Sequence, residues 1–189
     1  KTLLPKIFKD ENRIESIDGI YVPFWLFNAK ADADMTYKAT RTTVWKDSKY
    51  TYTKTSHYRI LRSGNLDFKN IPVDGSKKMD DSFMEAIEPY NMSEARTFNS
   101  AYLSGFLADK YDVTSDEARP RANERLKNST EQIFRETVKN YGSVITENSR
   151  VRVTKSSIKY ALLPVWLLNT NYKGKIYTFA MNGQTGRFV

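Results

Sequence analysis

The chain has 189 residues, of which 40% are hydrophobic and 13% aromatic, so it can bury a substantial core and is not a disordered tail. It contains no cysteine, which excludes disulfides, zinc–thiolate sites and thiol nucleophiles within this stretch. Its longest uninterrupted apolar run covers only residues 161–168, whereas a helix needs about 20 apolar residues to cross a bilayer.

The net charge of +8 is unevenly distributed along the chain. Residues 64–118 carry a net charge of −6, whereas residues 1–63 carry +5 and residues 119–159 carry +6. A basic block of this kind can attract nucleic-acid phosphates or anionic lipid headgroups, or it can face the acidic block of its own chain. Segregated charge within one domain is most often a solvated surface, so charge alone does not identify a partner.

The two ends indicate a piece of a longer protein. Residues 1–13 are charged and contain Pro5, and we expect a linker or the remnant of a helix there. The chain starts at Lys1 without an initiator Met or a signal-peptide pattern, and it stops within an apparent strand at Val189.

Residues 14–73 have the pattern of an antiparallel β meander. Ala31, Ala33 and Met35 alternate with polar residues, which is the period of a strand with one solvent-facing side. We expect a polar turn at 46–49 and a break at 63–65, where Ser, Gly and Asn follow one another.

Two segments share the pattern Pro-x-Trp-Leu-x-Asn, at 23–28 and at 164–169. Each follows an apolar lead-in and reads as a strand too apolar to face water, so we expect both of its sides to be covered. The repeat indicates either a divergent internal duplication or a single sheet in which two unrelated strands have the same sequence pattern. The residues that we assign to the structural core are Pro23, Trp25, Pro164 and Trp166.

The period changes between residues 74 and 141, and we predict a helical insert there. A first short helix is expected around 79–87, and Asn99 is a candidate N-cap for a second one that reaches about residue 107. Thr114 and Glu117 have the spacing of a capping box.

The main helix of the insert is expected from about residue 121 to 139, after a kink or restart at Pro120. Its periodicity predicts one buried stripe along the helix. The stripe consists of Ala122, Leu126, Thr130, Ile133 and Thr137.

Residues 142–189 return to a β pattern, with turns expected at 172–175 and at 182–186, where glycines supply positive φ. The predicted fold class is therefore α+β, with twisted antiparallel β-sheets and a helical insert. We predict one domain over 14–189, divided into a β meander (14–73), the insert (74–141) and a second β unit (142–189).

Four stretches carry a resemblance to a known family: IYVPFWLF (20–27), PRANER (120–125), YALLPVWLLN (160–169) and FAMNGQTG (179–186). They resemble a bacterial family, mostly of Firmicutes, whose members contain a transcription-factor-IIB-type zinc ribbon. The resemblance implies a cysteine-rich ribbon before Lys1 and hydrophobic membrane segments soon after Val189. It also implies a cytoplasmic, membrane-associated protein whose zinc lies upstream, so we expect no cofactor in this segment.

The polar residues give no catalytic or metal-binding constellation. His57 is the only histidine and has no nucleophile motif near it. Asp32 and Asp34 share one side of a strand, and the acids at 80–88 lie on an expected helix, where a solvated face explains them. Some members of the resembled family are described as helicase-like, but no G-x-x-x-x-G-K-[ST] phosphate loop occurs here. We predict that the segment is not an enzyme.

Two sets of residues are candidates for binding. Basic residues interleaved with rings can bind single-stranded nucleic acid, and an arginine-rich surface can bind phosphates or lipid headgroups. The candidate exposed rings are Trp45, Tyr50 and Tyr52, beside Lys46 and Lys49. The candidate anion-binding residues are Arg121, Arg125, Arg135, Lys139, Arg150 and Arg152.

We therefore predict a non-catalytic binding or assembly module of a longer, membrane-tethered zinc-ribbon protein. The alternative is nucleic-acid (DNA) binding through the basic block at 119–159. The sequence names no protein partner, and membrane contact is expected only through segments outside this chain.

Overall fold

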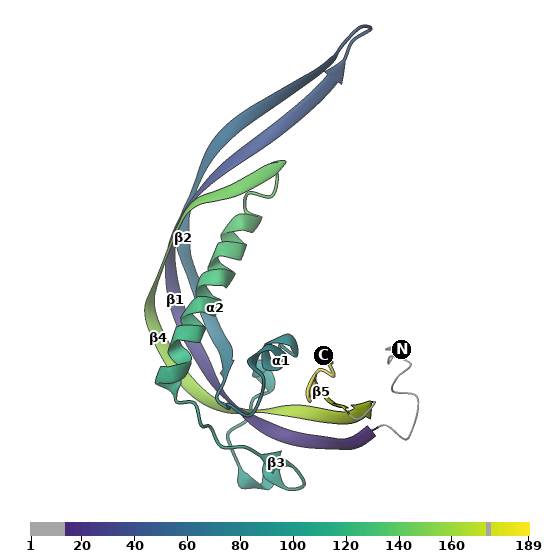
Figure 1. Ribbon diagram of the computed structural model, residues 1–189. Coiled ribbons are helices and arrows are strands. Elements are labelled where there is room, and N and C mark those ends of the chain that lie inside the picture. Colours follow the sequence, from purple (N-terminus) through teal and green to yellow (C-terminus); the bar gives the residue numbers. More distant parts are fainter. Residues whose placement is uncertain (1–13, 173–174) are drawn as a thin grey trace. The chain divides into compact units, whose positions relative to one another are not determined.

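The computed structural model describes residues 14–172 and 175–189 (Figure 1). The expected linker or helix remnant at 1–13 lies outside the described residues, as does the middle of the turn expected at 172–175. The strands are β1 (Ile14–Lys46), β2 (Thr51–Asp74), β3 (Leu107–Ala108), β4 (Ser143–Tyr172) and β5 (Lys175–Asn182). The helices are α1 (Asp81–Ala86) and α2 (Ser115–Glu136), with 3₁₀ helices η3 (Met92–Glu94) and η4 (Ser100–Leu103).

The chain is mostly β, with 55% of its residues in strands and 21% in helices, so the predicted α+β class with a helical insert is wrong. The strands run through positions that we expected to end them. β1 is 33 residues long, and β2 continues through the Ser-Gly-Asn break that we expected at 63–65. A strand with one face in water tolerates such residues, because small and polar side chains on that face need no packing partner.

The insert is also less helical than predicted. The helix expected at 99–107 is only the four-residue η4, although Asn99 does cap it by accepting a hydrogen bond from the backbone N–H of Ala101. Gly105 then takes φ = +83°, which turns the chain out of the helical path, and Leu107 and Ala108 form β3 instead.

The strands form one sheet in the order β2-β1-β4-β5, with β3 pairing β1. β3 runs parallel to β1, with Ile20 opposite Leu107. β5 runs antiparallel to β4, from Val165 opposite Asn182 to Asn171 opposite Ile176. β2 is therefore an edge strand along its length.

The residue contacts divide the chain into two compact units. Unit 1 comprises Lys1–Leu26, Pro72–Ala118 and Lys159–Val189, and unit 2 comprises Phe27–Ile71 and Arg119–Ile158. Each unit has its own hydrophobic core. The single domain predicted for 14–189 stays a prediction.

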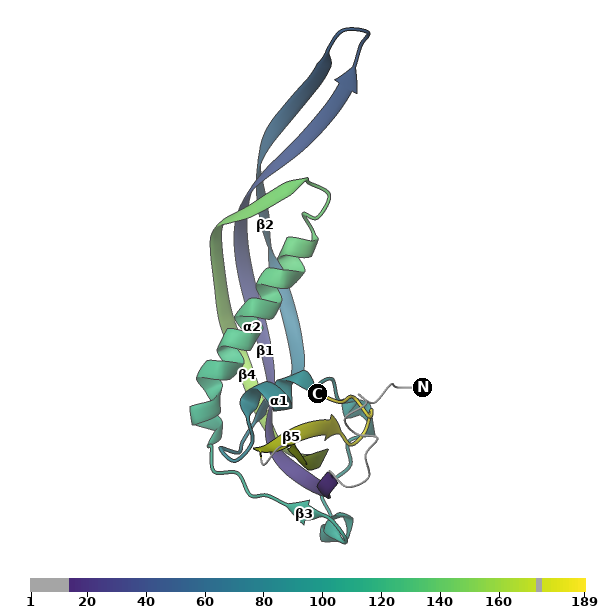
Figure 2. The ribbon, with the colours of Figure 1, turned by 45° about the vertical axis from the view of Figure 1, so that its right-hand side comes forward.

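The core of unit 2 joins β1 to helix α2, which lies along one face of the strands (Figure 2). Ala33, Met35 and Tyr37 are buried while their neighbours in sequence face outward, so the predicted period of two is confirmed. They pack with Phe134 of α2 and with Val138 in the turn that follows the helix.

The buried stripe of α2 follows every fourth residue: Ala118, Ala122, Leu126, Thr130 and Phe134. Val138 continues the spacing in the turn after the helix. The predicted stripe is therefore confirmed at its first three positions and wrong at Ile133 and Thr137, which are exposed. Steps of three and four residues lie on neighbouring rows of a helix, so the apolar pattern alone did not choose between them.

Helix α2 begins at the predicted capping box. The backbone N–H of Thr114 donates to Glu117 Oε2 over 2.7 Å, and the backbone N–H of Glu117 donates to Thr114 Oγ1 over 3.3 Å. The helix runs from Ser115 through Pro120, so the start expected at about residue 121 is wrong, and of the kink or restart expected at Pro120 the restart does not occur. Pro120 removes one intrahelical hydrogen bond near the helix start, and the capped first turn offsets that loss.

The core of unit 1 is built around the two Pro-x-Trp segments. Val22 and Phe24 of β1 pack with Leu163 and Val165 of β4, and Met84 of α1 and Ile87, the residue after this helix, belong to the same core. The turn predicted at 182–186 is confirmed: the backbone N–H of Gly186 donates to the carbonyl oxygen of Asn182, and Gly186 has φ = +74°.

Candidate functional site

The first Pro-x-Trp segment carries a ring that is fully engaged. Pro23 is buried and Trp25 is half-buried. Trp25 Nε1 donates to the carbonyl oxygen of Val113 over 2.9 Å. Its ring meets Tyr111 and Tyr160 edge to face, at centroid distances of 5.2 and 5.3 Å. These contacts make Trp25 a structural anchor of unit 1, with no polar atom left for a ligand.

The second segment is more open. Leu163 and Val165 are buried, but Pro164 and Trp166 are only half-buried, so this strand is not covered on both sides as we expected. Trp166 meets Phe106 edge to face at 5.9 Å. Both rings line an open pocket of about 360 Å³. We call it the Trp166 pocket, and its walls are Ile17, Asp18, Gly19, Gly105, Phe106, Leu107 and Trp166.

Two glycines shape the Trp166 pocket. A Cβ at Gly19 would lie 2.7 and 2.8 Å from ring carbons of Phe106 and 3.2 Å from Trp166, so only glycine lets both rings approach this wall. The positive φ of Gly105 turns the chain so that Phe106 and Leu107 return beside β1. These glycines are far apart in sequence, and sequence reasoning missed the pocket for that reason.

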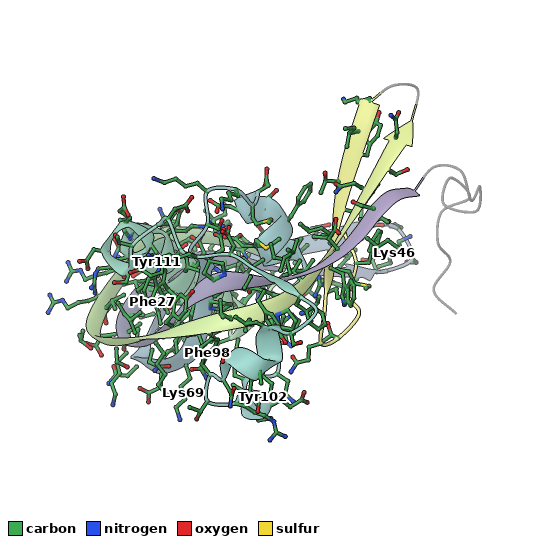
Figure 3. The ribbon with its side chains drawn as sticks, turned by 90° about the horizontal axis from the view of Figure 1, so that it is seen from below. Phe27, Lys46, Lys69, Phe98, Tyr102 and Tyr111 are labelled. Atoms are coloured by element: carbon green, nitrogen blue, oxygen red, sulfur yellow. The ribbon has the colours of Figure 1, made fainter. Side chains whose placement is uncertain are left out.

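The side chains that line the pocket are aromatic or aliphatic except for the carboxylate of Asp18, and polar atoms make up about half of its surface. Leu107 in the lining is 62% exposed, and two rings that precede it in the sequence are also exposed, Phe98 by 64% and Tyr102 by 51% (both labelled in Figure 3). An exposed apolar surface of this kind usually marks a place where another molecule docks. An aromatic ring that carries a hydrogen-bond donor could contact the rings of Phe106 and Trp166 and donate to the carboxylate of Asp18.

Unit 2 carries a second candidate surface, which we call the arm: residues 41–55, all of which are exposed. The backbone N–H of Gly142, just before β4, donates to the carbonyl oxygen of Thr40 over 2.9 Å. β1 and β2 then continue as a two-stranded ribbon past the end of β4 (Figures 1 and 2). The sequence predicted the turn at 46–49 but not this extension.

The turn of the arm is held by Asp47. Its carboxylate accepts hydrogen bonds from the backbone N–H groups of Lys49 and Tyr50, both over 2.7 Å, and from the hydroxyl of Tyr52 over 2.9 Å. These bonds hold the pKa of Asp47 below its ordinary value, because they stabilise the charged form. The tip of the arm therefore has a fixed conformation.

The three candidate rings gather at this end of the arm. Trp45 and Tyr52 stack with centroids 5.5 Å apart and planes 12° from parallel, and Tyr50 meets Tyr52 edge to face at 6.3 Å. Tyr50 is the most exposed of the three, at 63%. The arm also contains four basic residues against the single acid Asp47: Arg41, Lys46, Lys49 and Lys54.

The six candidate anion-binding residues do not gather on one face. Arg121 and Arg125 of α2 are half-buried, Lys139 is exposed, and Arg135 donates to the carbonyl oxygen of Val144 over 3.0 Å. Arg150 and Arg152 of β4 alternate with Val151, which packs against the core under α2. The two arginines therefore lie on the opposite face of the sheet from the helix.

That outer face mixes charges of both signs. Thr154 Oγ1 of β4 donates to the carbonyl oxygen of Lys30, and Lys30 Nζ lies 3.6 Å from a carboxylate oxygen of Asp67 on β2. Nearby, Glu147 pairs with Lys38 over 2.7 Å and with Arg59 over 3.3 Å. A face of alternating sign attracts a polyanion less than a uniformly positive one.

Other polar candidates lie apart from both surfaces. His57 is exposed on β2. Among residues 14–172 and 175–189, no group of three or more His, Cys, Asp or Glu side chains could hold a metal ion. In the same part of the chain, no helix is long and apolar enough to span a membrane.

Comparison with known proteins finds a relative of unknown function. The chain is 37% identical over 187 residues to the uncharacterized protein YdjG of Bacillus subtilis (strain 168). The match covers 99% of this chain and 55% of that protein, so the chain spans about half the length of its relative. No protein-family model and no solved structure matches the chain.

Proposed function

We propose that the chain is a non-catalytic binding or assembly module of a longer protein. The observation that carries this proposal is the arm, in which two strands leave the sheet and display three rings and four basic side chains to solvent. An isolated two-stranded ribbon is only marginally stable in water, and exposed rings gain free energy when a partner covers them. Both arguments favour a role of the arm in docking.

The Trp166 pocket supports binding over catalysis. Its walls offer one carboxylate and no histidine, hydroxyl nucleophile or second acid. General acid–base catalysis needs a titratable group with a partner that tunes it, and nucleophilic catalysis needs an activated nucleophile. An open hollow lined by two aromatic rings and one carboxylate is better suited to hold a side chain or a ring.

The setting of the module is also a proposal. The resemblance to zinc-ribbon proteins supports a metal-binding ribbon and membrane segments outside residues 1–189. The relative from Bacillus subtilis is longer than this chain, as such a setting requires. On this proposal the module works in the cytoplasm, close to the membrane that anchors the longer protein.

The alternative, DNA binding through the basic block at 119–159, has less support. Its basic residues lie on both sides of the unit 2 sheet, and the block also contains Glu147, which pairs with Lys38 and Arg59. Phosphate binding that depends on counterion release needs several cations along one surface.

The proposal can be tested by site-specific crosslinking in cells that express the chain. A photo-reactive phenylalanine analogue replaces Tyr50 at the arm, and in a matched control it replaces Ile145, which is equally exposed on β4. We expect a discrete adduct from position 50 only, and its loss when Lys46 and Lys49 are changed to Glu. Equal labelling from both positions, or none from position 50, would contradict the proposal.

A further inference from the structure

We propose that the Trp166 pocket binds an aromatic side chain on an extended peptide segment, because it is the open counterpart of a site that the chain fills with its own residues at Trp25. This inference rests on the proposed function of the chain as a binding module, and it names a site and the chemical class of its ligand.

The two Pro-x-Trp segments match over more residues than the motif itself. Residues 16–28 and 157–169 share Ser, Ile, Pro, Trp, Leu and Asn at the same six positions. The strand that ends beside each segment also ends alike. β2 ends at Asp74 and is followed by Gly75, and β5 ends at Asn182 and is followed by Gly183.

The matching residues make the same contacts. Asn28 Nδ2 donates to Ser157 Oγ over 3.2 Å. Its counterpart Asn169 donates from Nδ2 to Ser16 Oγ, also over 3.2 Å. Each segment thus gives to the other what it receives, and such reciprocal contacts are typical of two copies of one structural unit. The surroundings of the two tryptophans can therefore be compared as two versions of one site.

At Trp25 the site is filled by the chain itself. Tyr111 and Tyr160 contact the indole ring edge to face, and their own ring centroids lie 5.8 Å apart, so three rings form one cluster. Trp25 Nε1 donates to the carbonyl oxygen of Val113, two residues after Tyr111. The backbone N–H of Val113 in turn donates to the carbonyl oxygen of Gly75 over 3.1 Å. The site is filled by one ring and by the main chain that follows it.

At Trp166 the same site has two rings and an open pocket. The counterpart of Tyr160 is Gly19, and the ring of Phe106 takes the space where a side chain at Gly19 would begin. Phe106 meets Trp166 edge to face, as Tyr160 meets Trp25. Within residues 14–172 and 175–189, no second ring contacts Trp166 and no acceptor takes its Nε1 hydrogen.

The filled version indicates which ligand the open version accepts. A ring placed against Phe106 and Trp166 would complete the cluster, since edge-to-face contacts of this kind favour a third aromatic group. A carbonyl oxygen two residues later could accept from Trp166 Nε1, as that of Val113 does from Trp25. An extended peptide offers both groups at this spacing, because side chains on one side of a strand recur every second residue.

The charge beside the site differs between the two versions. The counterpart of Lys159 is Asp18, the one ionisable residue of the pocket lining. Opposite charges around an anchor speed association and fix its orientation, so a basic residue next to the aromatic one suits the open pocket. The segment that fills the other version has this order, with Lys110 directly before Tyr111.

The first test follows the indole N–H signals of the chain by NMR during a titration with a peptide. The probe is Ser-Lys-Tyr-Ser-Val-Thr with blocked ends, which reproduces residues 109–114 with serine in place of the two aspartates. Of the three tryptophans, Trp25 and Trp45 serve as internal controls. We expect a saturable shift of the Trp166 signal alone, with a dissociation constant on the order of 0.1–1 mM for so small a contact.

Two results of this titration overturn the inference. One is the absence of a saturable shift of Trp166 at millimolar peptide. The other is an equal shift with a probe that has alanine in place of the tyrosine, because the ring would then not be the group that binds.

The second test reverses the charge of the pocket. Asp18→Lys should weaken binding of the probe roughly threefold to tenfold, and a probe with glutamate in place of its lysine should regain it. Asp34→Lys is the matched control, because Asp34 is exposed on the same strand outside the pocket lining. Circular dichroism checks the fold, and Asp18→Asn serves if Asp18→Lys does not fold. Equal weakening by Asp18→Lys and Asp34→Lys overturns the inference.

The two proposals fail in different ways. A discrete adduct from position 50 together with no binding of the probe overturns the peptide site and leaves the binding module in place. Absence of both the adduct and the probe binding overturns both proposals.

Discussion

The backbone N–H of Gly183 donates a hydrogen bond to the carbonyl oxygen of Pro164 over 2.9 Å. The first Pro-x-Trp segment has the same contact, from Gly75 to Pro23 over 2.8 Å. In both cases the glycine follows a buried Asn or Asp, at 182 and at 74. A proline nitrogen cannot donate a hydrogen bond, but the carbonyl oxygen of each proline accepts one from the residue that follows a neighbouring strand, β2 for Pro23 and β5 for Pro164.

The contact at Gly183 predicts a strong effect of a single methyl group. In Gly183→Ala the new Cβ would lie 2.8 to 3.0 Å from Cβ, O and C of Pro164, and backbone atoms cannot move aside as a flexible side chain can. We expect a loss of about 1–3 kcal/mol in the free energy of unfolding, the usual cost of overpacking. Urea denaturation measures it.

Gly64→Ala is the control for that measurement. Its Cβ would meet only the tip of the Phe134 ring, at the ordinary distance of 3.7 Å. We expect no loss, or a gain of about 0.4–1 kcal/mol from a less flexible unfolded chain. Equal losses in both variants would show that the Pro164 contact is not the cause.

Asn182 should be sensitive because all of its side-chain polar atoms are used inside unit 1. It is fully buried, its Nδ2 donates to the carbonyl oxygens of Ile87 and Pro89, and its Oδ1 accepts from the backbone N–H groups of Gln184 and Thr185. Asn182→Ala leaves these groups without their partner, and we expect a cost of about 2–3 kcal/mol by thermal or chemical denaturation. Asn182→Asp keeps the acceptor but not the donor, so a variant as stable as the native chain would refute the donor role.

The corrected stripe of α2 predicts a contrast between neighbours. Phe134 is buried among the β1 side chains, so Phe134→Ala should cost about 3–5 kcal/mol in the free energy of unfolding. Ile133 is 41% exposed, and Ile133→Ala should change it by about 0.5 kcal/mol or less. A larger loss of stability in Ile133→Ala than in Phe134→Ala would instead support the stripe predicted from the sequence.

Asp109 should make unit 1 sensitive to acid. Burial alone would raise the pKa of Asp109, but hydrogen bonds from Lys78 over 2.6 Å and from Ser76 over 2.9 Å outweigh it and lower the pKa below the ordinary value of 3.8. A carboxyl group with a lowered folded-state pKa stabilises the fold above its unfolded pKa, and this contribution is lost as the pH falls through the folded one. The stability difference between the native chain and Asp109→Asn should therefore be constant near neutral pH and shrink below about 3.8. A difference that grows in acid would contradict the assignment.

The basic residues of the 119–159 block lie on both faces of the unit 2 sheet, and this arrangement predicts weak binding to DNA. Fluorescence anisotropy with single-stranded and duplex oligonucleotides at low salt should show little affinity, with a shallow dependence on salt concentration. Arg121→Gln together with Arg125→Gln should not change it. Tight binding that these substitutions abolish would favour the nucleic-acid alternative and contradict our preference for protein assembly.

The sequence predicted features that depend on neighbours along the chain. The alternation through Ala33 and Met35 and the capping box at Thr114 are local patterns, and both are confirmed. Features that depend on distant contacts were missed. Trp166 lies in an apolar run that reads as core, yet Gly19 and Gly105, far from it in sequence, leave its ring beside an open hollow. Likewise, the sequence predicted the exposed rings of the arm but not the length of β1. No residue in β1 marks the point where the strand extends beyond the hydrophobic core.

The position of β2 at the edge of the sheet has one further consequence. A strand of 24 residues at the edge of a sheet offers a template on which copies could stack into fibrils, and natural proteins guard such edges with positive charge. β2 has Lys54, Arg59, Arg62 and Lys69 along it. We therefore expect these cations to keep copies of the chain from aggregating through the β2 edge. Variants that neutralise them should precipitate more readily, whether or not the binding of a partner changes.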